Sequence, residues 1–99
     1  MSFVTAMSEA MTATAGGLQD VGAAVTAGNA AAATPTTGVI PAAADAVSAL
    51  TAVQFATHAQ MYQAISAQAA TIHAMFVATL GASAGSYAAT EAANAGTLI

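Results

Sequence analysis

Apolar side chains recur three or four residues apart over two long stretches of the chain, and this spacing is typical of one face of a helix. In the first stretch the recurring positions are Met7, Met11, Thr14, Leu18, Val21 and Val25. The heptad pattern predicts a helix over residues 8–33 with one continuous apolar stripe. Ser8 is its expected N-cap, and Glu9 falls in the first turn, where a carboxylate meets the positive end of the helix dipole.

A connector with two prolines and a glycine, residues 34–41, separates the two stretches. Proline is disfavoured in a helix interior, so this connector is expected to end one helix and precede the next. The second helix is predicted over residues 42–80, with Gly81 and Gly85 as stop signals and a flexible tail over residues 81–99. Because a short connector makes two helices antiparallel neighbours, the expected fold class is all-α, a two-helix hairpin forming one domain.

The second predicted helix carries two apolar stripes. One stripe is expected to pack against the first helix in a seam made of Met7, Met11, Leu18, Val21, Val25, Val47, Leu50, Met61, Ile65 and Ile72. The other stripe lies on a neighbouring face and consists of Phe55, Tyr62, Ala69, Phe76 and Leu80. One hairpin mate cannot cover both stripes, so the aromatic stripe is predicted to bind a second protein in a helical bundle.

Charge and composition narrow the possible partners. The 99 residues include no Lys or Arg, four Asp or Glu, and no Cys. Without cations the chain cannot neutralise phosphates, which excludes nucleic-acid binding by counterion release and docking on anionic lipids through basic side chains. The apolar fraction of 58% is mostly alanine, which favours helix but contributes little area when buried. The expected result is high helicity with a thin core.

Neither a secretory signal peptide nor a membrane-spanning helix is expected from the sequence. The first residues lack the cationic and apolar regions of a secretory signal peptide. A membrane-spanning helix needs about 20 mostly apolar residues, whereas polar residues such as Gln54, His58 and Gln63 interrupt the second stretch every few positions. The sequence therefore predicts a soluble chain that needs a partner.

Candidate catalytic and metal-binding side chains do not come together in this pattern. His58 and His73 are separated by about 22 Å along a continuous helix, so they cannot share one metal ion within one chain. The four carboxylates are scattered, whereas an acid–base pair needs two carboxyl groups within several ångströms of each other. The segment 81–85, Gly-Ala-Ser-Ala-Gly, matches the letters of a nucleophile elbow but follows a helix and not a strand. We therefore expect no enzymatic activity, no cofactor and no metal.

Tyr87 and Glu91 are four residues apart, so on a helical turn they would project from the same side. They lie at the end of a long stretch, residues 46–90, that carries no charged side chain. One aromatic ring beside one isolated anion is a simple combination for a receptor to recognise. The alternative is an ordinary exposed pair near a frayed helix end, because Tyr-x-x-x-Glu occurs by chance in many helical proteins.

Several segments, taken in order, together resemble the mycobacterial PE family. They are the opening residues 1–4 and the runs 29–38, 41–45, 47–50, 58–63, 72–73, 76–77 and 86–94. The resemblance covers essentially the whole chain, which looks like a short member with no C-terminal extension. It implies a helical hairpin that pairs with a PPE-family protein in an elongated bundle, and a pair that a type VII secretion system exports folded.

The resemblance also implies roles for particular residues and a cellular route. Tyr87 and Glu91 would form the family's Tyr-x-x-x-Asp/Glu export signal. A cytosolic chaperone would bind the PPE partner and so act on this chain indirectly. The protein would be synthesised in the cytosol and then secreted or retained at the cell surface.

Two positions depart from the family's pattern. The Pro-Glu dipeptide near the start reads Ser8-Glu9 here, and the acidic pair after the connector reads Asp45-Ala46. Serine can replace proline at a helix start, so the fold is expected to be unaffected. The missing charge at Ala46 is expected to alter partner choice, because rim charges tune specificity more than affinity.

A hypothesis from a different class is a self-assembling or membrane-associated protein of the cell envelope. In that case the same apolar faces would close on copies of the chain or enter a bilayer interface. Interfacial helices usually carry Lys or Arg on their polar face, and the absence of both disfavours this alternative.

Overall fold

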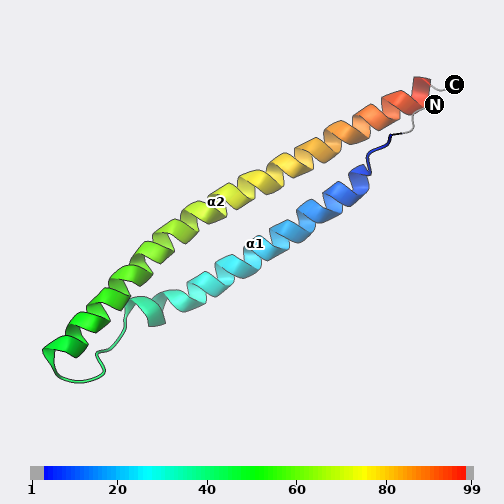
Figure 1. Ribbon diagram of the computed structural model, residues 1–99. Helices are drawn as coiled ribbons and strands as arrows, with labels where there is room; N and C mark the ends of the chain where they lie inside the picture. The colour runs from blue at the N-terminus through cyan, green and yellow to red at the C-terminus, as the bar shows by residue number, and fades with distance from the viewer. Residues whose placement is uncertain (1–3, 98–99) are drawn as a thin grey trace. The chain divides into compact units, whose positions relative to one another are not determined.

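The computed structural model describes residues 4–97, which form two α-helices (Figure 1). Helix α1 spans Ser8–Thr37 and helix α2 spans Ala46–Thr97. Within residues 4–97 there is no strand. The predicted all-α helical hairpin is therefore confirmed.

The two helices pair within two compact units. The terminal unit contains Met1–Gly22 and His73–Ile99, and the connector unit contains Ala23–Ile72. Each unit thus includes a part of α1 and a part of α2. All contacts below lie within one unit or the other.

Both ends of α1 differ from the prediction. The N-cap is Met7 and not Ser8, because the Met7 carbonyl accepts hydrogen bonds from the N–H groups of Ala10 (3.1 Å) and Met11 (3.2 Å). At the other end α1 continues beyond residue 33 through Pro35. A proline in the last turn removes only one intrahelical hydrogen bond, and the hydroxyl groups of two threonines bind carbonyls of the preceding turn. These bonds run from Thr36 to Ala32 (2.6 Å) and from Thr37 to Ala33 (2.7 Å).

Asp45 sets the beginning of α2. The helix was predicted to start at residue 42, but it starts at Ala46 with Asp45 as its N-cap. The Asp45 Oδ1 accepts a hydrogen bond from the Ser48 N–H (2.8 Å), and its Oδ2 accepts one from the Ser48 hydroxyl (2.9 Å). The backbone N–H of Ser48, followed by its hydroxyl, lowers the pKa of the Asp45 carboxyl below its ordinary value.

This lowered pKa predicts an acid-sensitive start of α2. A group whose pKa is lower in the folded state stabilises folding at pH values above its unfolded pKa, and the contribution disappears as the pH falls through the folded value. We expect acidification below about pH 4, the ordinary range of an Asp carboxyl, to destabilise the wild type more than Asp45→Asn, which retains a capping oxygen but does not titrate. Thermal unfolding at pH 7 and pH 3, followed by circular dichroism, measures the difference. Identical acid dependence of the two proteins would contradict the prediction.

The C-terminal part of α2 is longer than predicted. The expected flexible tail is wrong for residues 81–97, which continue the helix to Thr97, whereas Leu98 and Ile99 lie outside the described residues. Gly81 and Gly85 do not end the helix, since no described glycine has a positive φ. Seven alanines lie between residues 82 and 95, and their high helix propensity offsets the cost of about 1 kcal/mol for each glycine.

The buried core of the described residues consists of alanines alone. Ala15 and Ala84 are buried in the terminal unit, and Ala52 and Ala59 are buried in the connector unit. A methyl group buries little apolar area, and hydrophobic stabilisation is roughly proportional to that area. The contact between the helices in each unit therefore contributes little hydrophobic free energy.

The predicted seam is wrong for eight of its ten residues, which are between 55% and 75% exposed. Only Met11 and Leu18 are half-buried. The exposed members are Met7, Val21, Val25, Val47, Leu50, Met61, Ile65 and Ile72. The physical reason is that the helices approach along small side chains at a neighbouring heptad phase, which leaves the larger side chains outside.

Helix α2 is long and apolar enough to cross a membrane by length and composition, contrary to the expectation from its interrupting polar residues. The mean hydropathy of its window of 18 residues is 1.3, and none of that window is buried. The core helix of a soluble protein can have the same length and composition.

Candidate interaction surfaces

In each unit the helices meet along positions with heptad spacing, which carry small or polar side chains in the connector unit and both small and larger apolar side chains in the terminal unit. In the terminal unit the buried and half-buried positions include Met11, Ala15, Leu18 and Gly22 of α1 and His73, Val77, Leu80 and Ala84 of α2. In the connector unit they include Asn29, Ala32 and Ala33 of α1 and Ala52, Ala56, Ala59, Gln63 and Ser66 of α2. We refer to these positions as the contact seam of each unit.

Gly22 faces the imidazole ring of His73 in the contact seam of the terminal unit. The Nε2 atom of His73 lies 2.6 Å from the Leu18 carbonyl oxygen. A carbonyl can only accept, so Nε2 carries a proton in this contact. A Cβ atom at residue 22 would lie 2.7 Å from His73 Cδ2 and 2.9 Å from Nε2. Glycine therefore gives the ring the space that its hydrogen bond requires, and His73 has a structural role.

Asn29 joins the two helices in the connector unit. Its Oδ1 accepts a hydrogen bond from the Tyr62 hydroxyl (2.7 Å), and its backbone carbonyl accepts one from Gln63 Nε2 (3.0 Å). The Tyr62 ring is thereby held across the side of the hairpin, although about half of the residue, 51%, remains exposed. This ring is an ordered and accessible aromatic group.

The residues of the predicted partner interface are exposed with one exception. Phe55, Tyr62, Ala69 and Phe76 are exposed, whereas Leu80 is half-buried in the contact seam of the terminal unit. At 3.6 residues per turn, the two predicted stripes lie on adjacent sides of α2 and form one broad surface. In the connector unit the large side chains of this surface, here called the outer face, are those of Val47, Leu50, Phe55, Met61, Tyr62, Ile65 and Ile72.

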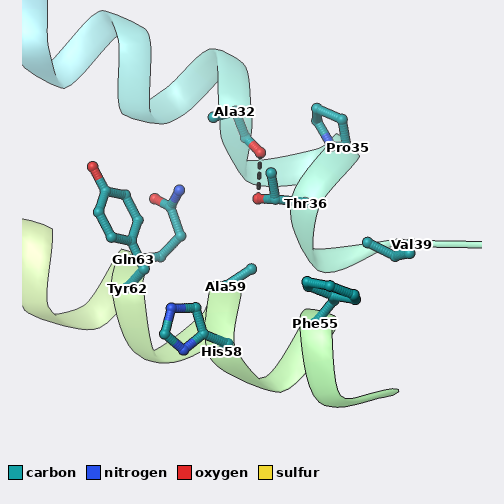
Figure 2. Close-up of a pocket in the computed structure, with 9 residues that line it drawn as sticks. All are labelled: Ala32, Pro35, Thr36, Val39, Phe55, His58, Ala59, Tyr62 and Gln63. Atoms are coloured by element: carbon teal, nitrogen blue, oxygen red, sulfur yellow. Dashed lines mark hydrogen bonds between the residues drawn. The ribbon is translucent and has the colours of Figure 1, made fainter. Parts of the chain in front are cut away.

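A shallow groove opens beside the outer face in the connector unit (Figure 2). Its lining residues are Ala32, Pro35, Thr36, Val39, Phe55, His58, Ala59, Tyr62 and Gln63, and its volume is about 310 Å³. The Thr36 hydroxyl already donates to the Ala32 carbonyl, as the dashed line in Figure 2 marks. The lining is otherwise mostly apolar, so the groove fits an apolar side chain of a protein partner better than a polar small molecule.

The carboxylates and imidazoles remain dispersed in the folded chain. Within residues 4–97 no three side chains of His, Asp or Glu are close enough together to hold a metal ion. His58 lines the groove of the connector unit, and His73 lies in the contact seam of the terminal unit.

Tyr87 and Glu91 lie within helix α2 and not on a frayed end. Tyr87 is 50% exposed and Glu91 is half-buried. The Glu91 Oε1 atom accepts a hydrogen bond from the backbone N–H of Ala6 at 2.7 Å. Sequence reasoning missed this contact, because no motif links two residues at opposite ends of the chain.

Comparison with known proteins matches residues 4–94 to the PE family. The chain is 65% identical over 95 residues to the PE family protein PE13 of Mycobacterium tuberculosis, and the match covers 96% of each chain. It is 56% identical over 98 residues to the PE-PGRS family protein PE_PGRS33 of the same organism, a match that covers 99% of this chain but 20% of that protein. It is also 52% identical over 94 residues to the PE family protein PE8, covering 95% of this chain and 34% of that protein.

Proposed function

Because this chain belongs to the PE family, we propose that it is a non-enzymatic subunit of a heterodimer with a PPE-family protein, and that a type VII secretion system exports the pair. The observation that carries the proposal is the outer face of the connector unit. Large apolar side chains are exposed there, while only alanines are buried in the described residues. In the proposed complex, helices of the partner cover this face and complete a bundle.

The free energy of burying apolar side chains favours a partner that covers the exposed residues of the outer face. Fully burying a Val, Leu, Ile, Phe or Met side chain contributes about 1.5–3 kcal/mol. Phe55, Ile65 and Ile72 are each more than half exposed in the hairpin. A partner that covers these side chains would add more hydrophobic free energy than four buried alanines provide.

The charge of the chain indicates what kind of partner surface fits. The formal net charge is −4, and no cation is present. No residue of the outer face is charged, so a complementary surface needs apolar side chains at its centre. Acidic groups on the partner's rim would be repelled by this chain.

Tyr87 and Glu91 are the proposed export element. In this proposal the pair serves as the Tyr-x-x-x-Glu signal, a cytosolic chaperone binds the PPE partner, and the heterodimer leaves the cytosol to be secreted or retained at the cell surface. The half-exposed Tyr87 ring supports the proposal, because a receptor can reach it while α2 stays folded.

Expression with and without the partner tests the heterodimer. We expect the chain alone to aggregate or fold poorly, and co-expression to give one stable complex, as judged by size-exclusion chromatography with light scattering. In the native host, Tyr87→Ala is expected to abolish secretion and leave the heterodimer intact. A monodisperse chain that unfolds cooperatively on its own would count against the heterodimer, and normal secretion of the variant would remove the signal assignment.

A second candidate function is self-assembly or membrane association in the cell envelope. The exposed, apolar window of α2 favours it, whereas the absence of Lys and Arg on the chain's polar surface disfavours an interfacial helix. Flotation of the chain with liposomes in the absence of a partner distinguishes the two functions, because a heterodimer subunit should instead remain with its mate.

A further inference from the structure

We infer that Glu91 acts as a clamp that fixes the N-terminal segment, residues 4–7, beside Tyr87, so that the export receptor recognises this segment and the Tyr87 ring as one surface. This inference rests on the proposed export function. It differs from direct recognition of the Glu91 carboxylate, because it makes Glu91 a positioning residue.

The hydrogen bond of Glu91 ties a segment without regular secondary structure to helix α2. Residues 4–7 have no regular secondary structure, and α1 starts directly after them at Ser8. The Ala6 N–H donates to Glu91 Oε1 at 2.7 Å, so the bond holds the residue just before the N-cap, Met7. In Figure 1 this dark blue segment lies beside the orange and red end of α2. This bond therefore fixes Ala6 of the segment against helix α2.

The export pair continues the contact seam of α2 in the terminal unit. Ala84, Tyr87 and Glu91 follow one another at spacings of three and four residues, so they share one side of the helix. Glu91 on this side contacts the N-terminal segment. Tyr87, one turn earlier, is therefore on the side of α2 where that segment is held.

Electrostatics explain why Glu91 binds a backbone N–H. The chain contains no Lys or Arg that could pair with the carboxylate. The N–H groups at the start of a helix carry partial positive charge, and a carboxylate nearby is stabilised. Glu91 lies more than one turn before the end of α2 at Thr97, so the negative end of its own helix opposes this placement little. The region just before the start of α1 is thus a favourable place for this anion.

Four variants distinguish the positioning role of Glu91 from direct recognition of its charge by the receptor. Ala6→Pro removes the donor N–H and keeps the Glu91 carboxylate. Glu91→Gln removes the charge and keeps an acceptor oxygen. Thr5→Pro is the control for the proline ring, because the structure of residues 4–97 records no hydrogen bond from the Thr5 N–H. Glu91→Ala removes both charge and acceptor.

The co-expressed complex is studied in the native host, with secretion read from the culture filtrate. We expect Ala6→Pro and Glu91→Ala to reduce secretion by about tenfold or more, the scale of losing one hydrogen bond to a charged group. Glu91→Gln and Thr5→Pro should remain near the wild-type level. Hydrogen exchange of the purified complex gives an independent readout: the Ala6 amide should be protected in the wild type and in Glu91→Gln, and should lose protection in Glu91→Ala.

Each contrary result has a distinct meaning. If Glu91→Gln fails like Glu91→Ala while Ala6→Pro is secreted normally, the receptor reads the carboxylate directly and the inference is overturned. An unprotected Ala6 amide in the wild-type complex also overturns it. Normal secretion of Tyr87→Ala instead removes the proposed export signal, and the exchange measurement then judges the clamp separately.

Discussion

Replacing Phe55 by alanine is expected to weaken the complex with the proposed PPE partner by about 2 kcal/mol or more, the cost typical of an aromatic anchor at an interface. Phe55 is 62% exposed in the hairpin, and its ring lines the groove of the connector unit (Figure 2). The packing between the two helices should be little affected, because the exposed ring contributes little to their buried core. The expected loss is therefore specific to the complex.

Val53→Ala is the matched control for this substitution. Val53 lies two residues before Phe55 and is similarly exposed, at 59%. Residues two apart on a helix do not face the same side, so Val53 lies away from the outer face. Thermal unfolding of the co-expressed complexes measures both effects. Equal midpoints for the two variants would show that the partner does not bind the outer face.

The two helices could be predicted from the sequence, but the packing between them could not. Heptad spacing and high alanine content determine the helices. Yet the large side chains, such as Val47 and Ile65, and the small ones, such as Ala52 and Ala59, both recur with helical spacing in neighbouring phases. Assigning the larger side chains to the interior is the usual choice, because they gain most from burial. In the connector unit the small residues let the helices approach, and the larger residues remain exposed.

The helix ends show a similar limit. Gly81 and Gly85 are helix-stop signals only where the backbone adopts a positive φ, and the alanine-rich segment around them keeps the helical conformation instead. Residue 42 was the predicted start of α2, whereas the hydrogen bonds from Ser48 make Asp45 the cap of a helix that starts at Ala46. The sequence thus predicts the start of α2 to within about one turn, and the hydrogen bonds determine which residue is the cap.

Part of the candidate interaction surfaces could be predicted from the sequence. The aromatic residues Phe55, Tyr62 and Phe76 could be identified because they repeat every seven residues, and all three are exposed. The contact between Ala6 and Glu91 could not be identified, because it joins a backbone N–H to a side chain 85 residues away. Every residue except proline has a backbone N–H. The residue type therefore does not indicate which N–H forms this bond, and the contact is seen only in the structure.

Gly22→Ala is expected to destabilise the protein, although alanine is the better helix former. The new Cβ would lie 2.7 Å from His73 Cδ2, so the imidazole must move and lose its hydrogen bond to the Leu18 carbonyl. Overpacking of this kind costs about 1–3 kcal/mol, which exceeds or cancels the gain of about 1 kcal/mol in helix propensity.

Gly16→Ala is the control for Gly22→Ala, because nothing lies within 4 Å of a Cβ added at Gly16. It should keep the full gain of about 1 kcal/mol, so the two variants should shift the unfolding midpoint of the complex in different directions or by clearly different amounts. Adding His73→Ala to Gly22→Ala removes the clashing ring, and the double-mutant cycle should reveal a coupling energy of about 0.5–3 kcal/mol. Equal stabilisation by Gly16→Ala and Gly22→Ala, with no coupling to residue 73, would show that the helices do not approach closely at this position.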